Sequence, residues 1–153
     1  MEKEPIEVTT AQIVLAPNTN NYGTIFGGKL VELMDMAGAL AAMRFANDEV
    51  VTASIDTIDF RMPVKQGDLV ELTSKVIYTG RTSMIVKVDA YRVRKFSGKK
   101  DFSCSGYFAF VAVESSGKPK SIPSLKLSTA EDKKLWKIGE SIRKKVLDRK
   151  ETE

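Results

Sequence analysis

Alternation of apolar and polar residues predicts five β-strands along the chain. This pattern is typical of strands that bury one face of a sheet. The alternating segments are residues 6–15, 52–62, 69–79, 84–93 and 102–113. Short connections at 64–68 and 80–81 favour antiparallel neighbours, because tight turns join only antiparallel strands.

Two of these segments carry specific expectations about their faces. In the segment 52–62, one face should hold Ile58, Phe60 and Met62. In the segment 69–79, one face should hold Val70, Leu72, Val76 and Tyr78. Side chains two residues apart lie on the same side of a strand, so each set should contribute to one surface of the sheet.

A long helix is predicted between the first strand and the other four. Residues 27–46 are an almost unbroken run of strong helix formers, enough for a rod of about 28 Å. Apolar residues occur on nearly every side of this helix, which is typical of a buried one. A loop rich in Pro, Asn and Gly precedes it at 16–24.

A second helix is predicted over residues 129–149, after an irregular stretch at 114–127. Thr129 and Asp132 resemble a capping box at its start. Its narrow apolar stripe consists of Leu135, Ile138, Ile142 and Val146. Such a helix must pack either on its own sheet or on a neighbouring subunit.

The order of these elements favours a mixed α+β fold. One antiparallel sheet of about five strands can wrap around one apolar helix and bury it, which is the hotdog arrangement. We expect a hotdog domain over residues 1–123 and a C-terminal extension with a helix over 124–153. The sequence shows no internal repeat and no second domain.

The amino-acid composition restricts the possible chemistry. The 153 residues include no histidine and one cysteine, Cys104. This excludes histidine triads, histidine general bases and histidine-ligated metals, and it leaves zinc without its usual ligands. We therefore expect no metal site. Cys104 is expected to be buried on a strand; the alternative, a nucleophilic thiolate, needs a neighbouring base.

Three features favour a cytoplasmic protein. A lone cysteine cannot form an intrachain disulfide, which fits a reducing compartment. No apolar run approaches the length of a transmembrane helix, so no membrane partner is expected. Residues 1–5 lack the apolar segment of a secretory signal.

The net charge of +4 suits anionic ligands such as phosphates. Basic residues concentrate at 92–100 and at 143–150. They are too few, and too mixed with acidic residues, to predict nucleic-acid binding. An ordinary solvated surface is the alternative interpretation of both clusters.

Asp35 is the main candidate for chemistry. It lies in the middle of the apolar helix, where an unpaired charge is costly. It must therefore face water, have a polar partner or serve a reaction. Lys29 and Glu32 in the same helix make an ordinary exposed face a real alternative.

Two glycines mark the start of the same helix. A helix N-terminus offers unpaired N–H groups, and Gly27 and Gly28 would let a carbonyl approach them closely. An oxyanion hole requires such accessible N–H groups. The alternative is an ordinary glycine-rich helix start without a function. In the preceding loop, Asn18, Asn20 and Asn21 could each cap the turn, orient a water or bind a carbonyl oxygen.

Another polar segment, Gly80, Arg81, Thr82 and Ser83, lies between two predicted strands. An ordinary hairpin turn would explain it. A phosphate contact is the functional alternative, with the Arg charge and the hydroxyl groups as donors.

Together these motifs resemble the hotdog acyl-CoA thioesterases, a family of bacterial acyl-CoA hydrolases with tandem-domain relatives in animals. The resemblance is carried by residues 18–28, 34–38, 60–64, 67–68, 80–83 and 117–119. It ends after Pro123 and so covers about four fifths of the chain.

The resemblance implies hydrolysis of acyl-coenzyme A (acyl-CoA) and assigns roles to particular residues. In the family, an Asn from the loop and an Asp from the helix meet in one site formed by two facing subunits. These positions match Asn20 and Asp35, and the N–H that polarises the thioester carbonyl matches Gly28 or its neighbour. Many members carry His before the glycine pair, where this chain, like other bacterial members, has Phe26. The resemblance therefore assigns no catalytic role to that side chain.

The same resemblance implies the mechanism and the partners. Asp35 would act as general base on water, or attack directly to give a transient anhydride. No cofactor is needed, the homodimer is the minimal active unit, and a trimer of dimers is frequent in the family. The CoA phosphates are expected near Gly80, Arg81, Thr82 and Ser83 and near Arg92, Arg94 and Lys95.

Two other functions are alternatives. A hotdog hydratase or dehydratase typically pairs a His with a carboxylate, and this chain has no His. A non-catalytic acyl-CoA sensor that regulates transcription needs a DNA-binding segment. Neither residues 1–5 nor 124–153 predict a helix-turn-helix pair, so hydrolysis is the favoured function.

Overall fold

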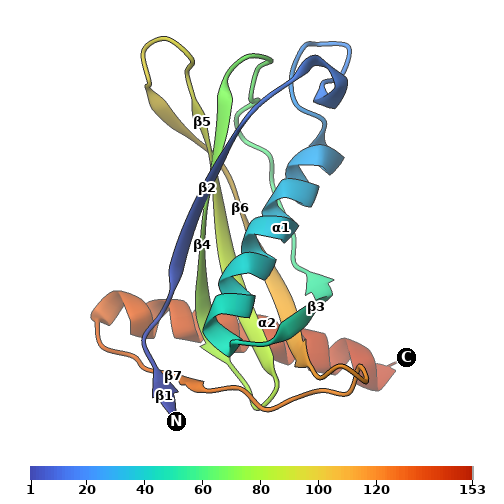
Figure 1. The fold of residues 1–153 in the computed structure, drawn as a ribbon, viewed down its shortest axis with the longest axis vertical. Coiled ribbons are helices and arrows are strands. Elements are labelled where there is room, and N and C mark those ends of the chain that lie inside the picture. The colour runs from blue at the N-terminus through green and yellow to red at the C-terminus, as the bar shows by residue number, and fades with distance from the viewer. Residues whose placement is uncertain (153) are drawn as a thin grey trace.

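A computed structural model describes residues 1–152 and places a long helix, α1 (Gly27–Ala46), against a curled antiparallel sheet (Figure 1). The sheet has the order β2 (Glu7–Ile13), β4 (Leu69–Thr79), β5 (Ser83–Val93), β6 (Lys100–Val113) and β3 (Glu49–Ile55). All four pairings in it are antiparallel. The predicted α+β hotdog arrangement is confirmed.

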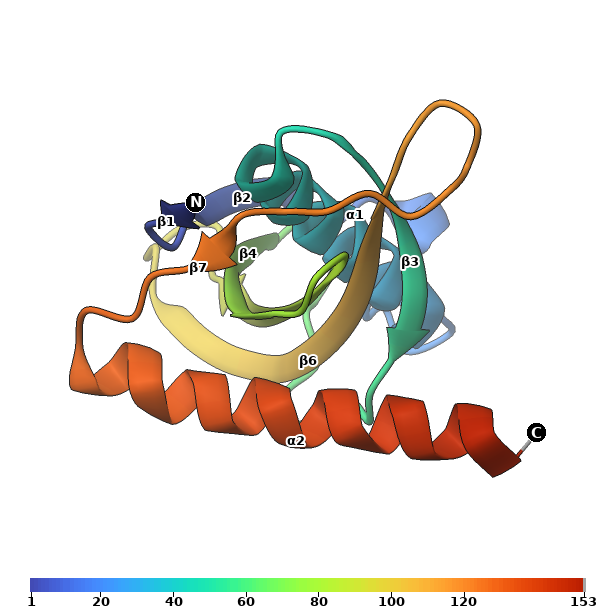
Figure 2. The same cartoon turned by 90° about the horizontal axis from the view of Figure 1, so that it is seen from below.

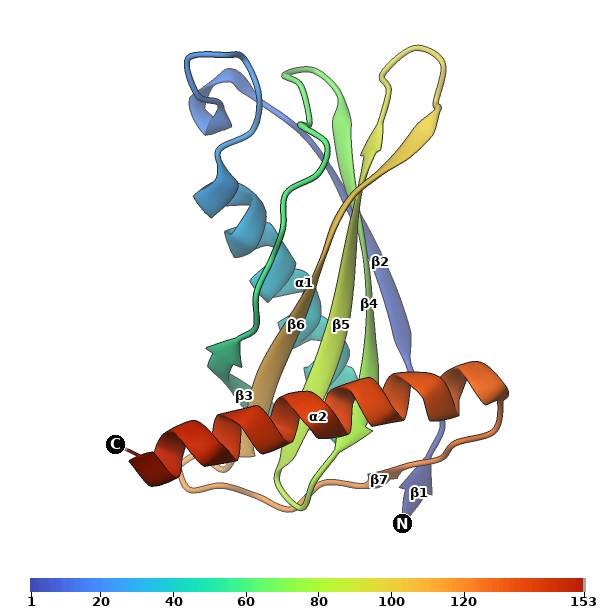
Figure 3. The same ribbon diagram turned by 180° about the vertical axis from the view of Figure 1, so that it is seen from behind.

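The sheet curls around α1 on its concave side, and a second helix, α2 (Ala130–Thr152), crosses its convex side (Figures 2 and 3). A short 3-10 turn, η1 (Ala16–Asn18), lies in the loop before α1. Two short strands, β1 (Glu2–Lys3) and β7 (Ser124–Leu125), pair in parallel and join the N-terminus to the segment before α2. Within residues 1–152, no helix is long and apolar enough to cross a membrane.

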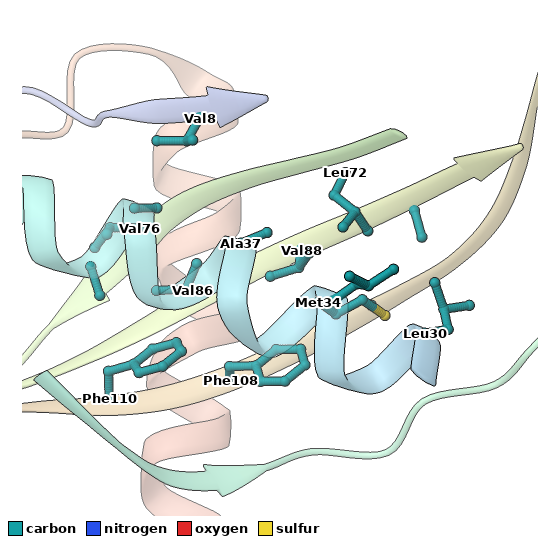
Figure 4. Packing of buried hydrophobic residues seen from close by; sticks show 14 of the residues in the cluster. Val8, Leu30, Met34, Ala37, Leu72, Val76, Val86, Val88, Phe108 and Phe110 are labelled. Carbon is teal, nitrogen blue, oxygen red and sulfur yellow. The ribbon is translucent and has the colours of Figure 1, made fainter. Parts of the chain in front are cut away.

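The core lies between α1 and the concave face of the sheet (Figure 4). Met34 and Ala37 of the helix pack there with Val88, Phe108 and Phe110 of the sheet. The prediction of a helix buried all round is wrong, because the curled sheet covers only one side of α1. Met36, on the other side, is 60% exposed.

The predicted strand at 52–62 ends early, because β3 stops at Ile55. Residues 56–62 still follow β6, but backbone hydrogen bonds join them to it only from Asp56 to Tyr107 and from Arg61 to Ser103. Between these two bonds the segment advances five positions, from 56 to 61, whereas β6 advances four, from 103 to 107. This unequal advance prevents a regular ladder of hydrogen bonds between the two segments.

The three side chains expected on one face of that strand consequently separate. Ile58 packs against the core, whereas Phe60 is 52% exposed. The Phe60 ring instead lies beside Gly27 at the start of α1, 3.7 Å from the place of a Cβ atom there. The segment after β3 thereby contributes to the surroundings of the helix N-terminus.

A bulge in β4 also overturns the expected position of Tyr78. The register shifts between Val76 and Tyr78, which turns the Tyr78 side chain to the convex face. There its ring lies 4.5 Å from the ring of Trp136 in α2. Single-residue slips of this kind reverse which side of the sheet a side chain covers.

The helix α2 docks on its own sheet, which decides between the two alternatives left by the sequence. Leu135 and Ile142 form a hydrophobic cluster with Ile77 and Ile85. The helix approaches so closely that a Cβ atom at Gly139 would collide with the Cβ of Tyr78. The boundary predicted at residue 123 stays a prediction.

The predicted capping box at the start of α2 is present. The Asp132 carboxylate accepts hydrogen bonds from the Ser128 and Thr129 N–H groups, and Thr129 Oγ1 accepts one from the Asp132 N–H. Lys75 from β4 adds an ion pair of 3.1 Å to Asp132. Burial opposes ionisation of this carboxyl, but these donors outweigh it and lower the pKa of Asp132 from its ordinary value.

Candidate active site

Asp35 lies on the side of α1 that faces β3, at the open edge of the sheet. Its Oδ1 accepts a hydrogen bond of 2.8 Å from Thr52 Oγ1. The residue is half-buried, and its second carboxylate oxygen has no hydrogen-bond partner in the described part of the chain. The structure therefore presents a carboxylate with one oxygen fixed and the other free to act on a ligand.

Thr52 is a site residue that sequence analysis missed. It lies 17 positions after Asp35, in a different element, so no local motif connects the two. Its only signal was a hydroxyl residue at the start of the segment predicted as a strand at 52–62. The hydrogen bond between Thr52 and Asp35 forms only because the tertiary structure places β3 beside α1.

The N-terminus of α1 is open. Among residues 1–152, no side chain caps this helix, no acidic residue lies in its first turn, and no acceptor takes the N–H groups of Gly27 and Gly28. A Cβ atom at Gly28 would have nothing within 4 Å. Since alanine stabilises a helix more than glycine, the protomer itself gives no reason for glycine at this position.

Asn20 lies in a tight turn just before that helix. Its backbone N–H donates to Thr24 O at 2.9 Å, and its backbone carbonyl accepts from the Gly23 N–H at 3.0 Å. Its side-chain Oδ1 accepts from the N–H groups of Tyr22 and Thr24 and from Thr24 Oγ1. The side chains of Asn18 and Asn21 have no hydrogen bonds to the described residues, so the structure singles out Asn20.

Two hollows flank α1. A cavity of about 320 Å³ lies at its N-terminal end and is lined by Thr24, Gly27, Phe60 and Arg61, among others. An open apolar groove of about 420 Å³ lies on the β2 side, where Met36 is a lining residue. The first hollow brings together the loop of Asn20, the helix start and the segment after β3.

The two segments predicted to hold the CoA phosphates lie at opposite ends of β5. Strand β5 has 11 residues. At roughly 3.3 Å per residue, it separates them by about 35 Å. One protomer does not bring both segments to one ligand.

At one end of β5, the basic residues are partly engaged in ion pairs. Arg92 Nε lies 2.7 Å from the buried carboxylate of Asp68, and Arg94 Nε lies 3.1 Å from Asp101. The Lys95 N–H also donates to Asp68. Burial opposes ionisation of Asp68, but these donors outweigh it and lower the pKa of its carboxyl from the ordinary value. Arg92 thus already has a carboxylate partner within the protomer.

At the other end, residues 80–83 form the turn between β4 and β5. The Gly80 N–H donates to Ser83 O, and Thr82 O accepts from the Ala112 N–H. Ser83 is buried, whereas Arg81 is exposed and its side chain has no partner among the described residues. Arg81 is therefore the charged group in this turn that remains available to a phosphate.

Cys104 is buried on β6, as expected. Its Sγ lies 3.8 Å from the Met34 Sδ, and burial raises the pKa of its thiol. A thiol in this setting is a poor nucleophile. Among residues 1–152, no cluster of three or more carboxylate or cysteine side chains could hold a metal ion.

Comparisons with known proteins identify the family of this fold. The model of the thioesterase superfamily matches residues 22–95. A Bacillus subtilis protein named uncharacterized acyl-CoA thioester hydrolase YkhA is 37% identical over 130 residues, which are 85% of this chain and 75% of the relative. The chain belongs to the hotdog-fold acyl-CoA thioesterases. The predictions of family and enzyme class are therefore confirmed.

Solved structures of acyl-CoA thioesterases resemble this chain over nearly its whole length. A structure described as an apo-hexameric acyl-CoA thioesterase has 39% identity and a TM-score of 0.86, and it covers 94% of this chain and 92% of its own. The Staphylococcus aureus acyl-CoA hydrolase, solved with butyryl-CoA, CoA and CoA disulfide, has 31% identity and a TM-score of 0.88. It covers 99% of this chain and 94% of its own, so the likeness includes α2.

Variants of the Staphylococcus aureus enzyme have also been solved. They carry alanine in place of one aspartate, one threonine or one asparagine. In that enzyme the asparagine precedes the aspartate by 15 positions, and the threonine follows the aspartate by 17. In this thioesterase, Asn20, Asp35 and Thr52 have the same two spacings.

Proposed function

We propose that this thioesterase hydrolyses acyl-CoA with Asp35 of one subunit, Asn20 of a facing subunit and the backbone N–H of Gly28. The observation that carries the proposal is the half-buried Asp35 carboxylate, with one oxygen held by Thr52 and the other free. The matching spacing of the three residues replaced in the Staphylococcus aureus enzyme supports Asn20 and Asp35, with Thr52 beside them.

In the proposed reaction, Asp35 takes a proton from a water molecule as the water oxygen bonds to the thioester carbonyl carbon. The carbonyl oxygen becomes negative and is stabilised by donors that include the Gly28 N–H. The C–S bond then breaks, the carbonyl re-forms, and CoA leaves as a thiolate that takes up the proton held by Asp35, which restores the carboxylate. Direct attack by Asp35, with water opening the resulting anhydride, is the second form of the proposal and has the same products.

A second subunit is part of the proposal because of distances along α1. Seven residues separate Gly28 from Asp35, which corresponds to about 10 Å of helix. A facing copy of α1 that runs in the opposite direction could bring its helix start and its Asn20 to Asp35. Exposed apolar residues on α1 and on β3 support such a contact, among them Met36 at 60% and Val51 at 50%.

The finer parts of the proposal concern assembly and CoA binding. A trimer of such dimers is supported by the solved relative that is described as hexameric. We place the CoA phosphates near Arg81 and Lys95, because Arg92 and Arg94 already have carboxylate partners. Subunit packing would have to bring these two regions to one ligand. A cytoplasmic location is supported by a mouse relative whose name includes the word cytosolic.

The direct test is release of thiol from acyl-CoA, measured with a thiol-reactive dye. We expect purified protein to release one thiol for each acyl-CoA consumed, across at least part of a panel of acyl chain lengths. A sensor would bind acyl-CoA without releasing thiol, and a hydratase would change the acyl group while the thioester persists. Binding without thiol release on every member of the panel would contradict the proposal.

A further inference from the structure

The Asn20 side chain is held in one orientation by its own loop. Its Oδ1 accepts hydrogen bonds from the Tyr22 N–H at 3.0 Å, the Thr24 N–H at 3.2 Å and Thr24 Oγ1 at 3.1 Å. Two of these donors are backbone N–H groups, which can only donate. The atom that faces them must be the amide oxygen, so the orientation of the amide follows from the chemistry of its neighbours.

This arrangement leaves the amide oxygen without capacity for a further partner. An amide oxygen has two lone pairs, and three donors already share them. Asn20 therefore has no acceptor left for the proton of a water molecule. The side chain could orient a water through Oδ1 only if the loop gave up one of these three bonds.

The nitrogen of the same amide is free. Asn20 Nδ2 makes no hydrogen bond to any residue from 1 to 152. Among these residues, no buried side-chain nitrogen or oxygen lacks a partner, so Nδ2 must be accessible from outside the protomer. The loop thus presents two N–H donors outward on a fixed support.

Thr24 supplies two of the three bonds that fix this orientation. Its backbone carbonyl also accepts the Asn20 N–H at 2.9 Å, which closes the turn. Thr24 further lines the cavity at the start of α1, beside Gly27. The residue therefore connects the Asn20 amide to the helix N-terminus.

We propose that Thr24 is a positioning residue for thioester hydrolysis, and that Asn20 acts only as a hydrogen-bond donor through Nδ2. This inference rests on the proposed function. Asn20 would donate to the thioester carbonyl oxygen as it becomes negative, together with the Gly28 N–H, and would transfer no proton. Asp35 alone would take the proton from water.

Substitution at Thr24 distinguishes the donor role from an acceptor role by the direction of the effect. Thr24→Val keeps the shape but removes the hydroxyl donor, and it loosens the amide. We expect kcat to fall about tenfold at nearly constant KM, because the weakened bond from Asn20 Nδ2 to the negative carbonyl oxygen is made only in the transition state. Thr24→Ser should restore kcat. A rise in kcat for Thr24→Val would mean that Oδ1 is the working atom, and an unchanged kcat would remove Thr24 as the positioning residue. Either result would overturn the inference.

A second pair of variants tests the same point at Asn20. Asn20→Asp keeps an acceptor for all three loop donors but removes both Nδ2 donors. We expect its kcat to fall by about 10²–10³, the loss typical of one oxyanion donor. Asn21→Asp, with the same added charge one residue away on an exposed side chain, should stay within about threefold of wild type, since a surface substitution of this kind has little effect. Substantial activity in Asn20→Asp would overturn the inference.

A measurement that does not need turnover separates this inference from the proposed function. The chain has Asn only at positions 18, 20, 21 and 47, so [¹⁵N]Asn labelling gives few side-chain NH₂ signals. Asn20→Asp identifies the pair that belongs to Asn20. We expect a ketone analogue of acyl-CoA, with CH₂ in place of the thioester sulfur, to shift this pair strongly in wild type and weakly in Thr24→Val.

The outcomes of the two kinds of experiment are distinct. A wild-type protein that releases no thiol would contradict the proposed function, whatever the Asn20 signals do. An Asn20 pair that the analogue leaves unchanged would overturn the donor role, even in an active enzyme. A pair that shifts equally in wild type and in Thr24→Val would remove Thr24 as the positioning residue.

Discussion

Asp35→Asn is expected to lower kcat for acyl-CoA hydrolysis by about 10²–10⁴, the range for loss of a positioned general base. The substitution is nearly isosteric, and the new side chain can still accept the bond from Thr52 Oγ1. What it loses is the basic oxygen that takes the proton from water, or that attacks the thioester. Thiol-release kinetics measure kcat and KM, and size-exclusion chromatography checks that the assembly is unchanged.

Glu32→Gln is the matched control for this substitution. Glu32 is an acidic residue on the same helix, its side chain is 58% exposed, and its ion pair is with Lys29. We expect its kcat to stay within about threefold of wild type, because exposed ion pairs contribute little. Retention of most of the activity in Asp35→Asn would remove Asp35 from the reaction.

Gly28→Ala is expected to separate activity from stability. A Cβ atom at this position meets nothing within 4 Å, and alanine is favoured over glycine in helices by up to about 1 kcal/mol. The melting temperature should therefore stay constant or rise. The methyl group would occupy the space through which a carbonyl approaches the helix N-terminus, so we expect kcat to fall by about 10–10³.

Gly38→Ala in the same helix is the matched control. It should lower the melting temperature and leave kcat largely unchanged. Its Cβ would lie 3.1 Å from a ring carbon of Phe110 and 3.2 Å from Val88, so these core side chains would have to shift by a few tenths of an ångström. Thermal unfolding and kcat should be compared for both variants. A Gly28→Ala enzyme with wild-type kcat would show that the helix start does not contact the reacting carbonyl.

The main elements of the fold were predictable because local patterns and tertiary structure agree there. The helix predicted at 27–46 has the bounds of α1, since its residues are strong helix formers and glycines mark its start. Strands β4, β5 and β6 start within two residues of the predicted positions and end at the predicted ones. The errors occur where the sheet bulges or ends, because alternation persists in sequence after the hydrogen-bond ladder has stopped.

The candidate site was only partly predictable for a related reason. Asp35 and Gly28 stand out locally, one as a charge in an apolar helix and the other as glycine at a helix start. Thr52 and Thr24 do not stand out, because their roles depend on which side chain lies opposite them. The candidate CoA residues were grouped by charge, and the structure shows that several of those charges have partners within the protomer.

A mixing experiment tests most directly whether Asp35 and Asn20 of different subunits form one site. Asn20→Ala and Asp35→Asn chains should each be nearly inactive alone. If a site takes one residue from each subunit of a two-fold dimer, random co-assembly gives one intact site in each mixed dimer and about a quarter of wild-type activity. Activity no greater than the sum of the two variants would contradict the shared site, because a site within one protomer cannot be restored by mixing.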